Sequence, residues 1–449
     1  MSQAVHQPPA REPASRGRSP RHRAALAAAA VPLLVLAGCS SSGDDGGTTE
    51  ITFLTTNDAP NPETAEALVE AFEAEHPDIS VSVEIRPGGT EGDNLIKTRL
   101  STGEMADVFF YNSGSLLQAL NPDSSLVDLS DQEWVGSLTE EFVPVASTDN
   151  GLYGAPLGAS FAGGVVYNKP LYEELGLTVP ETWDEFMANN EKIAAEGDGV
   201  APVIQTYGET WTSQLFVLGD FANVLAVDPE WADQYTAHQR SYADEPALEG
   251  FQHQQEVAEA GYFNEDFPSA TFPDGARMVA EGEGVHYPML SSVIQTVLQN
   301  TPDGVDDLGF FALPAEDAEN TQATIWQPNA LYVPRSTEGA ELEAAKEFVA
   351  FANSDAGCAV QNELLPPAGP YAGTCDVPDD APPLLDDIQA YFDEGRTANA
   401  LEFLSPVKGP NLEKVTVEVG SGIRSAEDAA AFYDQDVESQ AKQLGLEGW

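Results

Sequence analysis

The sequence predicts an α/β protein in which helices cover mostly parallel sheets. Two observations lead to this class. Strand and helix patterns alternate along the chain from residue 50 onward, which is the order of elements in parallel sheets with crossover helices. About 410 residues follow a leader-like first segment. That is more than one hydrophobic core usually holds, so we expect two lobes.

The alternation is clearest in the first third of the chain. Residues 51–54 are an apolar strand signal, and Pro62 then opens a pattern with apolar residues three and four apart, as in a helix. Residues 79–85 alternate apolar and polar side chains, as a half-buried strand does. A second helix around residues 95–100 precedes the apolar run 108–111, which predicts a fully buried strand.

The second half of the chain continues in the same way. Residues 165–167 predict another strand, and Thr182 with Glu185 forms the capping-box pattern that starts a helix. Apolar residues at helical spacing predict two late helices, one over residues 342–352 and one that begins at Ser425.

The first segment has the pattern of an export signal. Five arginines precede an apolar run over residues 24–36, which at about 13 residues is too short to span a membrane as a helix. The run ends in Leu36–Cys39, which resembles the bacterial lipobox. We therefore expect a lipoprotein signal peptide over 1–38, a palmitate-bearing lipidated Cys39, and a flexible tether through residue 49. This places the protein outside the cytoplasm, held on the outer face of the cell membrane by its lipid. The alternative is that the segment begins a globular domain.

Two cysteines remain after Cys39. Cys358 and Cys375 would close a loop of about 18 residues in an oxidising compartment, and such a disulfide stabilises by about 3 kcal/mol in the chain-entropy model. The alternative is two independent thiols. We favour the bridge.

The charge is strongly negative. The chain has 19 basic and 74 acidic residues, a net of −55, and without the leader the net is about −59. Such a surface repels nucleic acid and anionic membranes, so we expect no nucleic-acid partner. Two explanations of this negative charge stay open: a salty habitat, or a general acidic bias of the organism's proteins.

Several segments resemble one known family when they are taken in order along the chain. They are Gly103–Phe110 with its G-x-x-x-D-hydrophobic pattern, Tyr153–Pro156 followed by Val166–Lys169, the P-x-T-W-x-E motif in Val179–Phe186, Phe272–Tyr287, and Leu331–Pro334 followed by Ala344–Phe348. Together they resemble the family-1 extracellular solute-binding proteins of the maltose-binding type. The resemblance covers nearly all of the chain after the tether.

The resemblance implies a two-lobed fold of the type II periplasmic-binding-protein kind. The N-terminal lobe would comprise 50–160 plus 329–355, and the C-terminal lobe 161–328 plus 356–449. The chain would cross between the lobes three times, near residues 160–164, 327–330 and 354–357. Gly163 and Gly164 suit such a crossover, although glycine serves close packing equally well.

The implied function is capture of a sugar or oligosaccharide between the lobes. Hinge closure around the solute would present both lobes to the permease subunits of an ABC transporter. We expect a monomer that needs no cofactor and no metal.

The candidate ligand-binding residues are aromatic and polar side chains that follow predicted strands or lie at the crossovers, because sugars need flat apolar surfaces and in-plane hydrogen bonds. They are Asn57, Asp58, Tyr111, Asn112, Ser113, Phe161, Tyr207, Glu209, Trp211, Tyr287, Trp326, Gln327 and Tyr371. Trp211 is the first choice for a ring that stacks on a sugar. A role in a turn or in the core is the alternative for each.

The sequence argues against an enzyme. After the leader it holds four histidines, none paired at metal-ligand spacing, and it has neither the H-E-x-x-H motif nor a phosphate-binding loop. Two other functions stay open. A polyamine or betaine would be held in a cage of three or four rings by cation–π contact. A glycoside hydrolase would need two carboxyl groups on either side of one bond.

Overall fold

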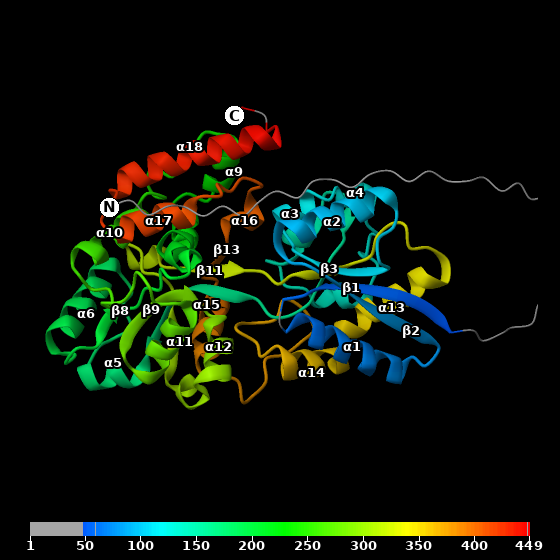
Figure 1. The fold of residues 1–449 in the computed structure, drawn as a ribbon, viewed down its shortest axis with the longest axis horizontal. Coiled ribbons are helices and arrows are strands. Elements are labelled where there is room, and N and C mark those ends of the chain that lie inside the picture. Colours follow the sequence, from blue (N-terminus) through cyan, green and yellow to red (C-terminus); the bar gives the residue numbers. More distant parts are fainter. Residues whose placement is uncertain (1–47, 59, 447) are drawn as a thin grey trace, which may run out of the picture. The chain divides into compact units, whose positions relative to one another are not determined.

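The computed structural model of the protein describes residues 48–58, 60–446 and 448–449 (Figure 1). The predicted signal peptide and Cys39 lie outside these residues. Among the described helices, none combines the length and the apolar character that a membrane crossing requires.

The first sheet has five strands in the order β2-β1-β3-β12-β6. Strands β1 (Thr49–Thr56), β2 (Ile79–Arg86) and β3 (Val108–Tyr111) run parallel, as the alternation of strand and helix predicted. Strand β12 (Ala330–Tyr332) pairs antiparallel with both β3 and β6 (Ala155–Pro156). Segments far apart in the sequence therefore complete one sheet.

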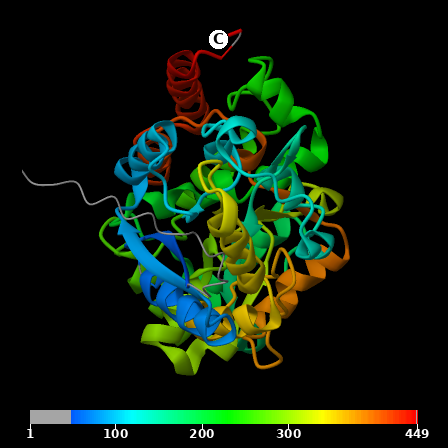
Figure 2. The same cartoon turned by 90° about the vertical axis from the view of Figure 1, so that its right-hand side faces the viewer.

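Helices pack on both faces of this sheet. Helix α1 (Asn61–Glu75) and helix α2 (Gly89–Thr102) lie on opposite faces (Figure 1 and Figure 2). Phe72 of α1 contacts Phe348 of α13 (Gly339–Ala352), with ring centroids 5.2 Å apart. We call this sheet with its helices and core the first lobe.

Helix α14 (Asp355–Leu364) also belongs to the core of the first lobe. Ala356 and Val360 of α14 pack against that core, beyond the bound at residue 355 that the sequence predicted. The crossover predicted at 354–357 is instead the N-terminus of this helix, where the Ser354 side chain accepts a hydrogen bond from the backbone N–H of Gly357.

The second sheet has the order β13-β11-β7-β9-β8, and β10 (Leu308–Phe311) also pairs with β7. Strand β7 (Phe161–Asn168) runs antiparallel to β9 (Gly284–Leu290), β10 and β11 (Ala323–Trp326). The parallel pairs are β8 (Ala201–Val203) with β9 and β11 with β13 (Thr397–Asn399). The sheet is thus mixed, whereas the sequence predicted a mostly parallel one.

Helices surround the second sheet. We call this sheet, its helices and the hydrophobic cores between them the second lobe. Those of eight residues or more are α6 (Trp183–Glu196), α10 (Glu249–Glu259), α11 (Phe272–Glu281), α12 (Val293–Asn300), α15 (Leu384–Asp393), α17 (Leu412–Gly420) and α18 (Ala426–Leu444). The shorter ones are α5 (Lys169–Leu175), α7 (Leu215–Leu218), α8 (Phe221–Val227), α9 (Trp231–Thr236) and α16 (Leu401–Leu404). The first lobe adds two short helices, α3 (Ser115–Gln118) and α4 (Pro122–Ser125), and a small pair of strands, β4 (Ser147–Thr148) and β5 (Gly151–Leu152).

Two glycines that the sequence placed at a crossover lie inside β7 instead. A Cβ at Gly163 would lie 2.5 Å from Cζ3 of Trp326, and a Cβ at Gly164 would lie 2.5 Å from the backbone oxygen of Phe311. Close packing, the alternative considered for these glycines, therefore explains them.

The cysteine pair forms the expected bridge. The Cα atoms of Cys358 and Cys375 are 5.2 Å apart and their sulfur atoms are bonded. The bridge ties the chain after α14 back to that helix. Between the two cysteines, Ser291 of the second lobe donates a hydrogen bond to the backbone oxygen of Ala368.

Candidate functional site

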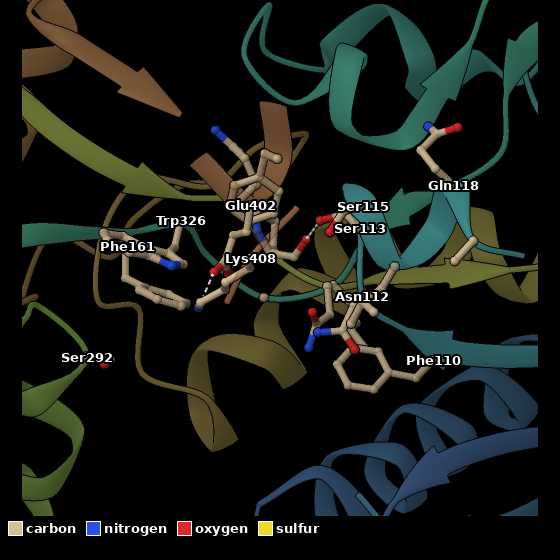
Figure 3. Close-up of a pocket in the computed structure, with 18 of the residues that line it drawn as sticks. Phe110, Asn112, Ser113, Ser115, Gln118, Phe161, Ser292, Trp326, Glu402 and Lys408 are labelled. Carbon is tan, nitrogen blue, oxygen red and sulfur yellow. Dashed lines mark hydrogen bonds and ion pairs between the residues drawn. The ribbon is translucent and has the colours of Figure 1, made fainter. Parts of the chain in front are cut away.

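A cavity of about 1170 Å³ lies between residues of the two lobes (Figure 3). From the first lobe it is lined by the end of β3 and by α3. From the second it is lined by β7, β11, α12 and α16. Three connecting segments, 157–159, 326–329 and 365–368, complete the lining. The cavity therefore lies where the chain passes between the lobes, as expected for a solute clamped by hinge motion.

Two aromatic rings form an apolar surface on the second-lobe side. Phe161 and Trp326 are register partners on β7 and β11, their ring planes are 6° from parallel and their centroids are 6.3 Å apart. Figure 3 shows both rings at the same side of the cavity. Trp326 reaches this position because Gly163 leaves room for the indole on β7.

Polar side chains from the connecting segments and from the residues just after β3 also line the cavity. Gln327 accepts a hydrogen bond from the Ser160 hydroxyl at 3.3 Å and donates one to Asn399 at 2.7 Å. Ser113 donates to the backbone oxygen of Pro328 at 2.9 Å. Asn112 projects from the end of β3 into the cavity in Figure 3.

The charged residues that line this cavity are Lys97, Glu402 and Lys408. Lys408 Nζ and Glu402 Oε2 form an ion pair of 3.1 Å, and both side chains are partly exposed. The lining thus holds two lysines and one carboxylate, in a chain of net charge −55. The local charge of the cavity is thus opposite in sign to that of the chain.

A smaller cavity of about 280 Å³ opens beside the first one, at the carboxyl ends of β1, β2 and β3. The two cavities share the lining residues Asn61, Phe110, Asn112, Leu116 and Asn329. The smaller one adds the ionisable residues Asp58, Arg86, Asp93 and Tyr111. We call it the side cavity.

The structure brings together about half of the residues that the sequence proposed. Asn112, Ser113, Phe161, Trp326 and Gln327 line the main cavity, and Asp58 and Tyr111 line the side cavity.

Three of the proposed tyrosines lie in the interior, away from both cavities. Tyr207 accepts a hydrogen bond from Gln254 at 2.8 Å, and Tyr287 is fully buried with its hydroxyl 2.9 Å from that of Thr206. Tyr371 donates to Asn362 at 2.7 Å. Their hydroxyl groups are thus already paired within the protein, and their rings serve packing.

The other proposed residues lie at the surface. Trp211 is 36 % exposed and packs on Phe272 at a centroid distance of 5.1 Å, outside the two cavities. Glu209 accepts from the backbone N–H of Phe272, and Asn57 accepts from that of Gly88, so both side chains hold together segments that are distant in the sequence.

Sequence reasoning missed several residues that line the main cavity. They are Lys97, Ser292, Gln295, Glu402, Phe403 and Lys408. The sequence held one signal for Lys408, because lysines are rare in this acidic chain. Lys408 also comes shortly after α16, the short helix that carries its ion-pair partner Glu402. Ser292 and Gln295 could not be predicted, because nothing in the sequence around them indicates that this end of a helix faces the cleft.

Comparison with known proteins places the chain in a family. The family model described as bacterial extracellular solute-binding protein matches residues 57–357. The multiple sugar-binding protein of Streptococcus mutans serotype c is 24 % identical over 297 residues, which are 64 % of this chain and 67 % of that protein. The melibiose/raffinose/stachyose-binding protein MelE of Bacillus subtilis is 28 % identical over 171 residues, 37 % of this chain and 39 % of that protein.

Solved structures show the same fold. RafE in complex with raffinose superposes with a TM-score of 0.68 at 21 % identity, over 87 % of this chain and 100 % of that one. A sugar transporter protein from Bacillus licheniformis in complex with stachyose gives 0.67 at 19 % identity, over 87 % and 100 %. The predicted two-lobed, type II periplasmic-binding fold is confirmed.

Proposed function

Because this chain belongs to the bacterial extracellular solute-binding protein family, we propose that it captures a sugar or oligosaccharide for an ABC importer. Relatives and structural neighbours carry names that specify multiple sugars, raffinose and stachyose. The solute would bind between the lobes, and hinge closure would present the closed form to the permease.

One observation of the site carries the proposal. Phe161 and Trp326 provide a flat apolar surface inside a cavity of about 1170 Å³, and amide and hydroxyl groups of Asn112, Ser113 and Gln327 lie around it. The C–H faces of a pyranose stack on such rings, while its hydroxyls hydrogen-bond to amides at the edge. The cavity is larger than one sugar ring requires, so the proposal includes oligosaccharides.

The residues of the cavity disfavour a cationic ligand. Glu402 is the one acidic residue among its lining, and Lys408 already pairs with it. Phe110 and Phe403 also line the cavity, but of these four rings only Phe161 and Trp326 form an aromatic pair with each other among the described residues. Two rings beside lysine do not form the aromatic cage that holds a quaternary amine.

The same composition disfavours glycoside hydrolysis. That reaction needs two carboxyl groups on either side of the scissile bond, and the lining of the main cavity supplies one. We therefore propose a binding protein without catalytic activity.

The remaining expectations belong to the same proposal. Lipid on Cys39 would hold a monomer at the outer face of the membrane. A short lipidated tether would keep the bound sugar close to the permease.

The test is a thermal-shift and calorimetry screen. The panel is melibiose, raffinose, stachyose and chitotriose, with spermidine and glycine betaine as the cationic arm. We expect at least one sugar to raise the melting temperature and to be recovered unhydrolysed, with no response to the cations. A response to the cations alone, or turnover of a sugar, would overturn the proposal.

A further inference from the structure

A groove on the second lobe lies outside both cavities between the lobes. It has a volume of about 540 Å³ and is formed by the C-terminal part of α10, the loop over residues 261–267 and the turn over residues 420–425 that joins α17 to α18. Figure 1 shows these three helices next to one another. The groove shares no lining residue with the main cavity or the side cavity, so the proposed sugar site does not account for it. We call it the outer groove.

The turn between α17 and α18 presents an apolar side chain to solvent. Ile423 is 73 % exposed, the largest fraction among the exposed large apolar residues of the described part of the chain. The rings of Phe263 and Phe267 also line the groove; their centroids are 5.4 Å apart and both are half-buried. Apolar side chains that gather at a groove on the surface are typical of places where a protein meets a partner.

Hydrogen bonds hold the walls of the outer groove in place. The backbone N–H of Ala426, at the start of α18, donates to Oε1 of Gln255 at 2.6 Å and so ties the turn to α10. In the loop, Asn264 is buried and accepts a hydrogen bond of 2.7 Å from the backbone N–H of Gln205. A surface that is already ordered loses little conformational freedom when a partner covers it, which favours binding.

The charges of the outer groove that lack an opposite partner are negative. Arg424 also lines the groove, but its Nε pairs with Oε2 of Glu418 at 2.7 Å, and its guanidinium carbon lies 4.7 Å from the ring centre of Phe432. Glu259 and Glu265 line the groove as well, and neither forms an ion pair with the residues that the structure describes. The groove therefore attracts cations, and the net charge of −55 adds to this attraction.

We propose that the outer groove is a docking surface for a basic segment of a partner protein, which inserts a branched or aromatic side chain between Ile423 and the rings of Phe263 and Phe267. Lysine or arginine side chains next to that apolar residue would pair with Glu259 and Glu265. This interaction goes beyond sugar capture and does not depend on it.

Charge favours this occupant over the others that an apolar groove could hold. A second copy of the chain would bring another net charge of −55 against the carboxylates, and an anionic membrane surface would be repelled in the same way. An uncharged small molecule would gain nothing from Glu259 and Glu265. A basic protein segment gains from the carboxylates and from the apolar side chains together.

The test measures binding of labelled octapeptides to the protein by fluorescence anisotropy at physiological salt. The probe alternates lysine with leucine around a central phenylalanine. One control peptide has glutamate in place of each lysine, and a second has serine in place of each apolar residue. We expect the probe to bind the parent and both control peptides to bind at least about tenfold more weakly, because each of them lacks one of the two contributions.

Two variants of the groove are compared with two matched variants of the first lobe. Ile423→Ser should raise Kd for the probe about tenfold, because it removes apolar surface that the probe would cover, and Glu265→Gln should raise it several-fold. The controls are Ile85→Ser and Glu75→Gln, since Ile85 is 54 % exposed on β2 and Glu75 is exposed at the end of α1. Both controls should bind the probe as the parent does.

Three results would overturn the proposal: equal affinity of the parent and Ile423→Ser for the probe, equal affinity of the parent for the basic and acidic peptides, or no binding of the probe. Sedimentation tests for a second copy, and a dimer of the parent that Ile423→Ser loses would also overturn it.

The sugar panel separates this inference from the proposed function. Ile423 and Glu265 are exposed and lie outside the cavities, so both groove variants should keep the melting temperature and the sugar affinity of the parent. A parent that binds the probe but no sugar would overturn the proposed function and leave the docking surface standing. A parent that binds a sugar but not the probe would do the reverse.

Discussion

Trp326 of β11 lies flat across Gly163 of β7, with Cζ3 of the indole 2.5 Å from where a Cβ on that glycine would be. The indole is also nearly parallel to Phe161, two residues earlier on the same strand. One glycine thus determines how the two rings present a common surface to the main cavity, and this surface is the part of the site on which the proposed function depends.

The first prediction follows from that contact. Gly163→Ala should tilt or displace the indole, because a Cβ at 2.5 Å from a ring carbon is not tolerated. We expect sugar affinity to fall at least tenfold. Gly136→Ala is the control, since a Cβ there has no neighbouring atom within 4 Å. Calorimetry on the two variants should separate them, and equal affinities would show that the orientation of Trp326 is unimportant.

The disulfide gives a prediction about stability. The double variant Cys358→Ser, Cys375→Ser should unfold in urea with a free energy of unfolding lower by about 3 kcal/mol, because the unfolded chain is no longer cross-linked. A reducing agent should have the same effect on the parent and none on the variant. Identical unfolding curves for the parent and the variant would contradict this expectation.

The disulfide should also affect binding. The loop that it closes contains residues 365–368, which line the main cavity. Gln295 of α12 donates a hydrogen bond of 2.9 Å to the backbone oxygen of Pro366 in this loop. Releasing the loop should weaken sugar binding several-fold through the cost of ordering it. Calorimetry under conditions where both proteins are fully folded measures this. Unchanged affinity would mean that other contacts order the loop without help from the bridge.

A half-buried carboxylate, that of Glu249, should make stability depend on pH. Burial, with repulsion from Glu245 and Glu316, raises the pKa of Glu249 to about 7. A carboxyl group with a raised pKa favours the folded state while it is protonated. Its contribution is fully present below the unfolded value near 4.5 and is lost as pH rises through about 7.

Urea unfolding at pH 5 and pH 8 tests this effect. Glu249→Gln should reduce the loss of stability between the two pH values, whereas Glu259→Gln, at the exposed end of the same helix, should not. If the parent is as stable at pH 8 as at pH 5, or if both variants behave alike, Glu249 is not responsible.

Much of the fold was predictable because local patterns repeat. The period of apolar residues predicted β1, α1, β2, α2 and β3 in order, and α6 begins directly after Thr182, whose side chain caps it. The antiparallel pairing of β7 was not predictable, since strand direction depends on contacts with residues more than 100 positions away.

The site was predictable only in part, for a physical reason. Residues just after β3 and at the first two connections between the lobes could be predicted, because side chains that follow a strand lie at the edge of the sheet, where no helix covers them. Inside the second sheet, both faces of a strand are covered, so the pattern around Tyr287 does not distinguish a core ring from a cleft ring. Trp211 was expected to stack on a sugar because it lies among polar residues in a glycine-containing loop. In the structure it packs on Phe272 at the surface.

The two tryptophans provide the most direct test of sugar capture between the lobes. Calorimetry of the parent, Trp326→Ala and Trp211→Ala against the sugar panel compares a ring inside the main cavity with one outside it. We expect the parent and Trp211→Ala to bind the same sugar with equal affinity and Trp326→Ala to lose binding. Retention of full affinity by Trp326→Ala would contradict the account.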